Sequence, residues 1–446
     1  MTQSSSSPGM RPFLVIWFGQ LISLIGSGLT SFALGVWTYQ RTGSVTRFAL
    51  ITFFGALPGI LLSPLAGALV DRWDKRKTMM LADTGSALST LSIALLLWAG
   101  RLDTWHIYAA VAFASACSAL QVPAWGAAIA LLVPKEKLDR ANGLVELALS
   151  LVPIVSPLLA GLLVVAIQLH GVILIDFATF LFSMVTLAMA RVARLAPSEP
   201  EPGASLLRDA AYGWKYVLAR PGLLGLLFFF AAINFSFSFS EVLLPPLVLK
   251  RASPTLLGTV LAAGGAGLVV SSLVVSTGWR LRRRVWGVLG GGALLGMSQM
   301  LIGLSSSWSL LLIGTFLQMF WVPLINAWSR TLWQLKVAPE VQGRVLAIRM
   351  AIAWSTTPIA FLCAGPLADH VFEPLLLEGG PLASSLGQVL GTGPGRGLGL
   401  LFVVLGLVPL LAGVAGLLNA RVRRVEEDLP DALDSAPATP LQPSTE

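Results

Sequence analysis

Residues 67–77, Gly-Ala-Leu-Val-Asp-Arg-Trp-Asp-Lys-Arg-Lys, form a short charged stretch between two long apolar runs. The runs cover residues 48–70 and 78–99. Each is long enough to cross a bilayer as a helix, which requires about 20 mostly apolar residues. Two acids and four bases within residues 71–77 would be costly to place in lipid. The stretch is therefore predicted to be a hairpin in water between two transmembrane helices.

The composition of the whole chain supports the same interpretation. Of its 446 residues, 55% are hydrophobic and only 12% are charged, whereas about a quarter of the residues of soluble proteins are charged. We therefore predict an all-α integral membrane protein with twelve transmembrane helices, at residues 12–38, 47–70, 78–99, 104–133, 141–168, 171–194, 222–249, 255–279, 285–304, 308–333, 345–370 and 397–420.

The basic residues are distributed unequally between the two sides that these spans define. The side that holds both termini carries 24 of the 30 Lys and Arg residues, and the other side carries six. Because basic residues concentrate in cytoplasmic loops, both termini are predicted to be cytoplasmic. The net charge of +8 is thus explained by topology, and no nucleic-acid partner is expected.

A hydrophilic break near the middle of the chain separates two groups of six spans. It contains Pro197, Pro200 and Pro202, followed by apolar residues at helical spacing. That spacing indicates an amphipathic helix on the inner leaflet, or alternatively a soluble helix that bridges the two halves. The predicted organisation is a cytoplasmic tail (1–11), an N-terminal half (12–194), a linker (195–221), a C-terminal half (222–420) and a disordered cytoplasmic tail (421–446).

The charged stretch also matches a known signature. Gly67, Asp71, Arg72, Arg76 and Lys77 resemble the G-x-x-x-D-R-x-x-R-[RK] motif between the second and third helices of the major facilitator superfamily. That resemblance implies a fold of two six-helix halves that works by alternating access, with a substrate site between the halves near the membrane midplane.

A second motif lies in the fifth span. Ser156, Pro157 and Gly161 resemble the Gly-Pro-x-x-Gly-Gly motif of drug:proton antiporters in the superfamily, with Ser156 and Ala160 where that motif has glycines. Together with short motifs in residues 175–180 and 338–345, this makes the chain most similar to the branch that holds macrolide-efflux proteins and the enterobactin exporter.

The predicted first, fourth, seventh and tenth helices each carry a polar or aromatic stripe. In the superfamily these four helices line the central cavity. Amides, hydroxyls and aromatic rings suit a bulky amphipathic ligand, held by ring contacts and a few directional bonds. The predicted lining residues are Gln20, Ser27, Gln121, Trp125, Asn234, Ser238, Gln318, Trp321 and Trp328.

Acids within the spans are candidates for proton coupling. Burial disfavours the charged form of a carboxyl, so such a group can take up and release a proton as access alternates. Glu241 is the deepest of these acids and the only one on a predicted cavity face, so it is the first candidate, followed by Asp176 and Glu146. For Asp83 and Asp369, near helix ends, structural pairing is expected, and it is also the stronger expectation for Glu146.

Asp71 is predicted to form a cytoplasmic gate. It ends the second helix, where a negative charge opposes the helix dipole and needs a partner. The resemblance implies that this acid faces the start of the eleventh helix, where Arg344 and Arg349 lie. We expect the contact to hold the outward-open state.

These observations predict a secondary active transporter, and proton-coupled efflux of an amphipathic drug-like or secondary-metabolite molecule is the first hypothesis. A lipid or lysolipid translocator of the same fold is the alternative, and an importer of a nutrient comes third. No enzyme is expected, because no Ser/His pair, His-x-x-x-His spacing or Gly-rich phosphate loop stands in a suitable context. We also expect no cofactor, no metal site, and a monomer in the inner membrane of a bacterium.

Overall fold

The computed structural model describes residues 10–134, 137–189, 214–276, 281, 283–337, 345, 349, 352 and 355–429. Within these ranges the chain is helical apart from short connections, and they contain no strand. The prediction of an all-α chain is confirmed.

The N-terminal half consists of α1 (Met10–Thr42), α2 (Val45–Arg72), α3 (Lys75–Trp98), α4 (Thr104–Leu132) and α5 (Leu138–Met189). α5 holds 52 residues, and Gln168 interrupts it with a φ of 57° and a ψ of −176°. It therefore contains two consecutive membrane helices, as predicted for residues 141–168 and 171–194.

The C-terminal half consists of α7 (Pro221–Leu249), α8 (Pro254–Ser276), α9 (Arg284–Leu304), α10 (Trp308–Lys336), α12 (Thr357–Pro366), the π-helical η2 (Leu367–Phe372) and α15 (Arg396–Leu418). Short turns α13 (Glu373–Leu375) and α14 (Gly387–Leu390) lie between η2 and α15.

Ten of the described helices are long and apolar enough to cross a membrane, including the double-length Leu147–Met189 segment of α5. α12 and η2 form the described end of a further span, so the helices match the predicted twelve-span pattern.

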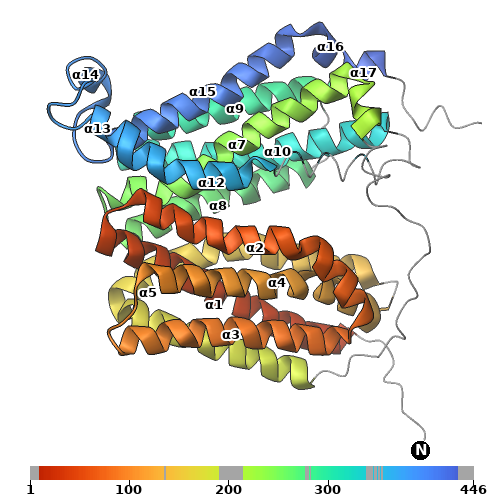
Figure 1. The fold of residues 1–446 in the computed structure, drawn as a ribbon. Helices are drawn as coiled ribbons and strands as arrows, with labels where there is room; N and C mark the ends of the chain where they lie inside the picture. Colours follow the sequence, from red (N-terminus) through yellow and green to blue (C-terminus); the bar gives the residue numbers. More distant parts are fainter. Residues whose placement is uncertain are drawn as a thin grey trace, which may run out of the picture.

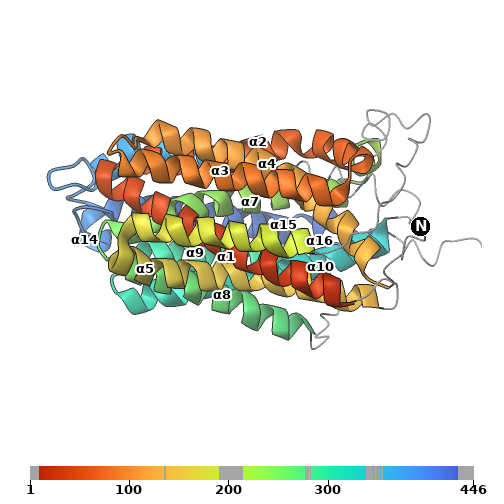
Figure 2. The same ribbon diagram turned by 90° about the horizontal axis from the view of Figure 1, so that it is seen from below.

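The two halves lie side by side as two helical bundles (Figure 1), and the long helices of both run roughly along one common direction (Figure 2). Across the boundary, α2 packs against α12 and α5 packs against α8. We call the end of the molecule with Thr46 and Asp369 the outer end, following the predicted topology, and the opposite end the inner end.

Local sequence explains where several helices begin. Ser44 caps α2 by accepting a hydrogen bond from the Arg47 amide, and Asp74 caps α3 in the same way. Asp103 and His106 form a reciprocal capping box at the start of α4. Each cap supplies an acceptor for amides that have no partner within the helix.

The alternating segment 234–240, Asn-Phe-Ser-Phe-Ser-Phe-Ser, lies inside α7 and is helical. The segment is helical despite its strand-like period of two, because an open strand cannot satisfy its backbone in lipid.

The start of the C-terminal tail differs from the prediction. Disorder was expected from residue 421, but residues 420–428 form α16 (Ala420–Arg423) and α17 (Val425–Asp428). Val422 and Val425 are buried in the core of the C-terminal half, and the Glu426 carboxylate accepts hydrogen bonds from the Arg284 and Val285 amides at the start of α9. The prediction is therefore wrong for residues 421–429, because both apolar and polar contacts fix this segment.

Most of the predicted linker lies outside the described residues. Its last part, residues 214–218, is helical, and Val217 is fully buried against the C-terminal half. Residues 1–9 of the predicted N-terminal tail (1–11) also lie outside the described residues, and residues 10 and 11 belong to α1.

Candidate transport cavity

A cavity of about 780 Å³ lies between the two halves. Residues of α1, α2, α4 and α5 line it from one half, and residues of α7, α8, α10 and α12 line it from the other. Most of the lining is aliphatic, aromatic or glycine, and the hydroxyl-bearing residues on it are Ser31, Thr52, Ser156, Thr315 and Thr357. Such a wall favours an apolar ligand body with a few polar contacts.

Glu241 of α7 is the only acidic or basic residue among the described lining residues. Its side chain is exposed although the residue belongs to a membrane helix, because it faces the cavity. Neighbouring Phe239 and Val242 are fully buried on the packed side of α7. Within the described part of the chain, no hydrogen bond or ion pair to the Glu241 carboxylate is found. The structure thus places the first proton-coupling candidate in the cavity, and its role stays a prediction.

The fifth-span motif also reaches the cavity and joins the halves. Ser156 and Pro157 line the cavity, and the Ser156 hydroxyl donates to the Ile25 carbonyl at 3.3 Å. Gly161 lies against α8, where Thr255 Oγ1 donates to the Gly161 carbonyl at 3.1 Å. A Cβ atom at Gly161 would lie 2.7 Å from the Pro254 carbonyl oxygen, so this crossing requires glycine.

Two predicted lining residues of the N-terminal half form a separate polar cluster. Gln20 Nε2 and Gln121 Nε2 donate to the two Asp83 carboxylate oxygens at 3.1 and 2.8 Å. Gln121 Nε2 also donates to Gln20 Oε1 at 2.8 Å, and Ser183 Oγ donates to Asp83 at 3.3 Å. The cluster therefore links α1, α3, α4 and α5 inside one half, and it gives Asp83 the structural pairing that was expected.

The predicted lining residues of the C-terminal half are similarly held between helices. Ser238 Oγ donates to Thr357 Oγ1 at 3.1 Å, and Gln318 Nε2 donates to Ser240 Oγ at 3.0 Å. Trp328 is only 8% exposed and belongs to the apolar core of this half.

The four remaining predicted lining residues contact neighbouring side chains or are half-buried in their helices. Trp125 stacks on Phe13 with ring centroids 5.8 Å apart, and Trp321 makes an edge contact with Phe320 at 5.4 Å. Ser27 and Asn234 are half-buried in α1 and α7.

None of the nine predicted lining residues is among the described residues that line this cavity. The physical reason is that polar side chains in a membrane protein satisfy one another between helices. Sequence reasoning missed the contribution of α2, α5 and α8, which line the cavity largely with small and apolar residues. The sequence feature that could have indicated these helices as cavity-lining is their glycines, such as Gly55 of α2 and Gly264 and Gly265 of α8, which line the cavity. Contact of the nine residues with substrate stays a prediction.

The other coupling candidates lie elsewhere. Asp176 is 1% exposed inside the N-terminal half, where Thr90 Oγ1 donates to its carboxylate at 3.2 Å. The side chain of Glu146 lies outside the described part of the structure.

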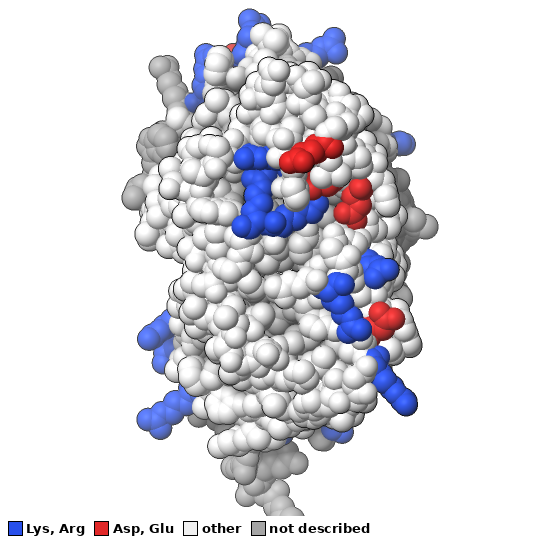
Figure 3. All heavy atoms as spheres, turned by 90° about the vertical axis from the view of Figure 1, so that its left-hand side faces the viewer, with Lys and Arg blue, Asp and Glu red and all other residues white. Residues whose placement is uncertain are grey.

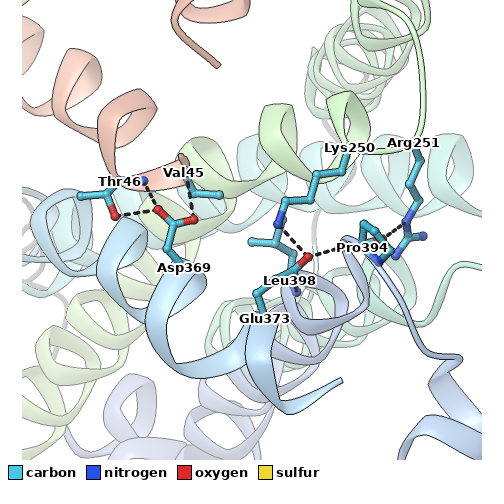
Figure 4. A network of polar contacts seen from close by, with 9 residues as sticks. Val45, Thr46, Lys250, Arg251, Asp369, Glu373, Pro394 and Leu398 are labelled. Atoms are coloured by element: carbon cyan, nitrogen blue, oxygen red, sulfur yellow. Dashed lines mark hydrogen bonds and ion pairs between the residues drawn. The ribbon is translucent and has the colours of Figure 1, made fainter. Parts of the chain in front are cut away.

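Asp369 joins the halves at the outer end (Figure 4). From η2 its carboxylate accepts hydrogen bonds from the Val45 amide at 3.1 Å and from the Thr46 amide at 2.8 Å. The Ser44 and Thr46 hydroxyls also donate to it, at 2.9 and 2.8 Å. Asp369 therefore caps the first turn of α2 from the opposite half, and structural pairing of this acid is confirmed.

A second set of contacts orders the loop beyond η2. The Glu373 carboxylate pairs with Lys250 at 2.7 Å and accepts from the Gly395 and Leu398 amides at the start of α15. Arg251 Nε donates to the Pro394 carbonyl at 3.4 Å. Burial lowers the pKa of Arg251, and the neighbouring Arg396 lowers it further. Figure 3 shows this outer end, where basic and acidic side chains lie next to one another.

The predicted cytoplasmic gate is only partly within the described structure. The surroundings of Gly67, the side chains of Asp71 and Arg72, and the whole of Arg344 lie outside it. Arg76 Nε donates to the Leu187 carbonyl at 3.0 Å, and the Lys77 amide donates to Asp74 at 3.1 Å.

Arg349, the other predicted gate arginine, lies over aromatic rings of its own half. Its guanidinium carbon is 5.2 Å from the Phe230 ring centroid and 5.6 Å from that of Trp333. A gating contact with Asp71 stays a prediction.

Two six-helix halves around a central cavity define a membrane transporter of the alternating-access type. The family comparison agrees with this class: the model described as "Major Facilitator Superfamily" matches residues 16–362. The chain belongs to the major facilitator superfamily.

Two named relatives are similar over most of the chain. Macrolide efflux protein A of Streptococcus pyogenes is 25% identical over 363 residues, covering 80% of this chain and 90% of the relative. The multidrug efflux pump Tap of Mycolicibacterium fortuitum is 25% identical over 423 residues, covering 93% and 97%. The predicted resemblance to macrolide-efflux proteins is confirmed.

Among solved structures, a bacterial homologue of the human lysosomal transporter Spinster, in an inward-facing and unoccupied conformation, superposes with a TM-score of 0.68. It is 13% identical and covers 98% of this chain and 100% of that one. This likeness shows the shared fold. The family and the efflux relatives identify the protein as a transporter of a cell membrane rather than an enzyme.

Proposed function

We propose that this protein exports an amphipathic molecule from the bacterial cytoplasm in exchange for protons, by alternating access of the central cavity. The observation that carries the proposal is a large apolar cavity between the halves with one carboxylate, Glu241, exposed within it. The efflux relatives support the direction of transport and the substrate class.

The lining suits an amphipathic substrate rather than a sugar or a strong anion. A sugar would require a dense set of donors and acceptors, whereas the described lining offers hydroxyls on an otherwise apolar wall. A strongly anionic substrate would require a base, and the described lining residues include none.

Glu241 supplies the proton-coupling step. An ionised carboxylate in an apolar site is unfavourable without a partner, so Glu241 should hold a proton in the empty cavity. When the substrate enters and offers a positive or polar group, the carboxylate can release that proton. Opening toward the outside then separates the two partners, and the acid is protonated again.

In the proposed cycle, the contacts of Asp369 and Gly161 between the halves keep the outer side of the cavity closed. Transport requires them to break when the cavity opens outward. The predicted contact of Asp71 with Arg344 or Arg349 would close the inner side in that state, with both termini in the cytoplasm. We propose that a single chain performs the whole cycle.

Transport in inside-out membrane vesicles tests the proposal. An imposed proton gradient, acidic inside, should drive accumulation of a fluorescent amphipathic dye, and an unlabelled macrolide should compete with it. Collapse of the gradient by a protonophore should release the dye. Dye accumulation that persists without a proton gradient would contradict proton coupling. Absence of dye accumulation in the presence of the gradient would contradict amphipathic efflux.

A further inference from the structure

A second, smaller pocket of about 330 Å³ lies at the inner end of the C-terminal half. The start of α9, the end of α10 and the tail helices α16 and α17 form it. Its lining consists of four bases, two acids and two leucines: Arg283, Arg284, Lys336, Arg423, Glu426, Glu427, Leu332 and Leu335.

The four bases converge because the tail is fixed against α9 and α10. Lys336 Nζ donates to the backbone carbonyls of Glu426 and Leu429 at 2.6 and 2.5 Å. The Glu426 carboxylate accepts from the first amides of α9. These contacts connect three chain segments that are distant in sequence, so the pocket is a feature of the folded chain.

The acids of the pocket do not balance its bases. Arg283 and Glu427 form an ion pair at 2.9 Å, but both side chains are more than half exposed, and such pairs contribute little to stability. Arg284 lies 3.9 Å from Glu426. Arg423 Nη1 donates to the backbone carbonyl of Leu417 at 3.2 Å. Four positive and two negative side chains leave an excess of positive charge.

Apolar side chains next to the pocket are exposed. Trp286 follows Arg283 by three residues and is 45% exposed, and Leu418, at the end of α15, is 75% exposed. Trp286 lies in the first turn of α9, which Arg283 of the pocket precedes. Leu418 directly follows Leu417, whose carbonyl accepts the hydrogen bond from Arg423 of the pocket, so both residues belong to chain segments that adjoin the pocket. In a membrane protein, exposed large apolar residues at helix ends contact lipid, and tryptophan favours the interface.

We propose that this pocket binds the phosphate group of an anionic phospholipid, whose acyl chains lie against Trp286 and Leu418. Guanidinium groups bind phosphate oxygens in pairs of hydrogen bonds, and basic pockets between membrane helices are suited to lipid headgroups. A bound phosphate would replace the exposed Arg283–Glu427 pair and connect α9, α10 and the tail. The proposal is independent of the transported substrate.

The test measures binding of short-chain phosphatidylglycerol to the purified full-length protein, with phosphatidylcholine and glycerol phosphate as comparisons. Phosphatidylcholine carries the same phosphate, but its cationic choline group makes the headgroup zwitterionic and would be repelled by the bases of the pocket. The pocket variant carries Arg283→Gln and Arg423→Gln. The control variant carries Arg421→Gln and Arg424→Gln, which removes the same charge from exposed tail positions that do not line the pocket. Thermal unfolding in phosphatidylcholine shows whether each variant is folded.

We expect saturable binding of phosphatidylglycerol, at least tenfold weaker in the pocket variant and changed less than twofold in the control. Phosphatidylcholine should bind at least tenfold more weakly. Equal losses in the two variants would show general surface attraction and overturn the proposal. Equally strong binding of glycerol phosphate would assign the pocket to a soluble phosphate and overturn the lipid assignment.

A third variant keeps the test informative if the pocket variant fails to fold. Glu427→Gln removes the acid that competes for Arg283, so phosphatidylglycerol should bind about threefold more tightly. Unchanged or weaker binding in this variant would contradict the proposal, because the competing carboxylate would then have no influence on the site.

Discussion

Replacement of Asp369 by asparagine should shift the protein toward states with an open outer end. The Asp369 carboxylate accepts two backbone and two hydroxyl hydrogen bonds from the first turn of α2. Asn keeps one acceptor oxygen, which can retain the bonds of Ser44 and Thr46. It loses the charge next to the helix N-terminus and the bond from Val45.

The expected magnitude follows from these losses. One hydrogen bond to a charged group contributes about 1.5–3 kcal/mol, and a charge at a helix N-terminus contributes roughly 0.3–1 kcal/mol. Asp369 is only half-buried, and water replaces part of both terms when the contact opens. We therefore expect the outer-closed state to lose about 1.5–3 kcal/mol, which is roughly a 10- to 150-fold shift in the equilibrium.

The assay is a distance measurement by electron spin resonance. Spin labels at Arg47→Cys and Leu377→Cys, two exposed outer positions in opposite halves, report separation of the outer ends in a chain whose Cys117 and Cys363 are replaced by alanine. Asp369→Asn should enlarge the population at longer distance.

Asp103→Asn is the matched control. Asp103 also caps an outer helix terminus, but it does so within one half. The spin-label distance distribution of the Asp103→Asn variant should equal that of the parent protein. If Asp369→Asn left the distribution unchanged, or changed it no more than the Asp103 variant does, the inter-half contact would not hold the outer end closed.

Three further substitutions test the packing. Gly365→Ala should also favour outer opening in the spin-label assay, because its Cβ would lie 2.2 Å from Thr46 Cα; an unchanged distribution would contradict this close approach. Asp83→Ala should destabilise the N-terminal half by about 2–3 kcal/mol, since it removes the charged acceptor that the Gln20 and Gln121 amides and the Ser183 hydroxyl share, and an unaltered melting temperature would refute that role. Glu426→Gln should cost about 1 kcal/mol through the α9 cap, visible as earlier thermal unfolding, whereas exposed Asp428→Asn should melt like the parent; equal melting of the two would show that the cap contributes nothing.

The sequence was sufficient to predict the helices and the two-half pattern, because membrane spans are long apolar runs whose ends are marked by charge. It was also sufficient to place Glu241 in the cavity. A charged residue in the middle of an apolar helix must face water or a partner, and few alternatives exist at that position.

The partners of the polar side chains could not be predicted in the same way. A stripe on one helix gives the direction of a side chain relative to that helix, but not the neighbour that it meets. Gln20 and Gln121 therefore seemed to be cavity residues, whereas in the fold they meet Asp83. Similarly, the contact of Asp369 with Thr46 joins residues 323 positions apart, and no local pattern specifies it.

The order in residues 421–429 was missed for a related reason. Their composition is polar and charged, which is typical of a disordered tail. Val422 and Val425 pack against Gly225 and Gly222 of α7, the Glu426 carboxylate caps α9, and Lys336 of α10 donates to two carbonyls of the segment.

Proton release on substrate binding shows whether Glu241 couples transport to protons. The purified protein, in a weakly buffered solution with a pH indicator, is mixed with a macrolide, and the protons released per bound macrolide are counted for the parent and for Glu241→Gln. Glu378→Gln, at an acid of the outer loop, serves as the control. We expect proton release by the parent and by the Glu378 variant, and none by Glu241→Gln. Equal release by the Glu241 variant, or macrolide binding to the parent without any release, would contradict proton coupling through Glu241.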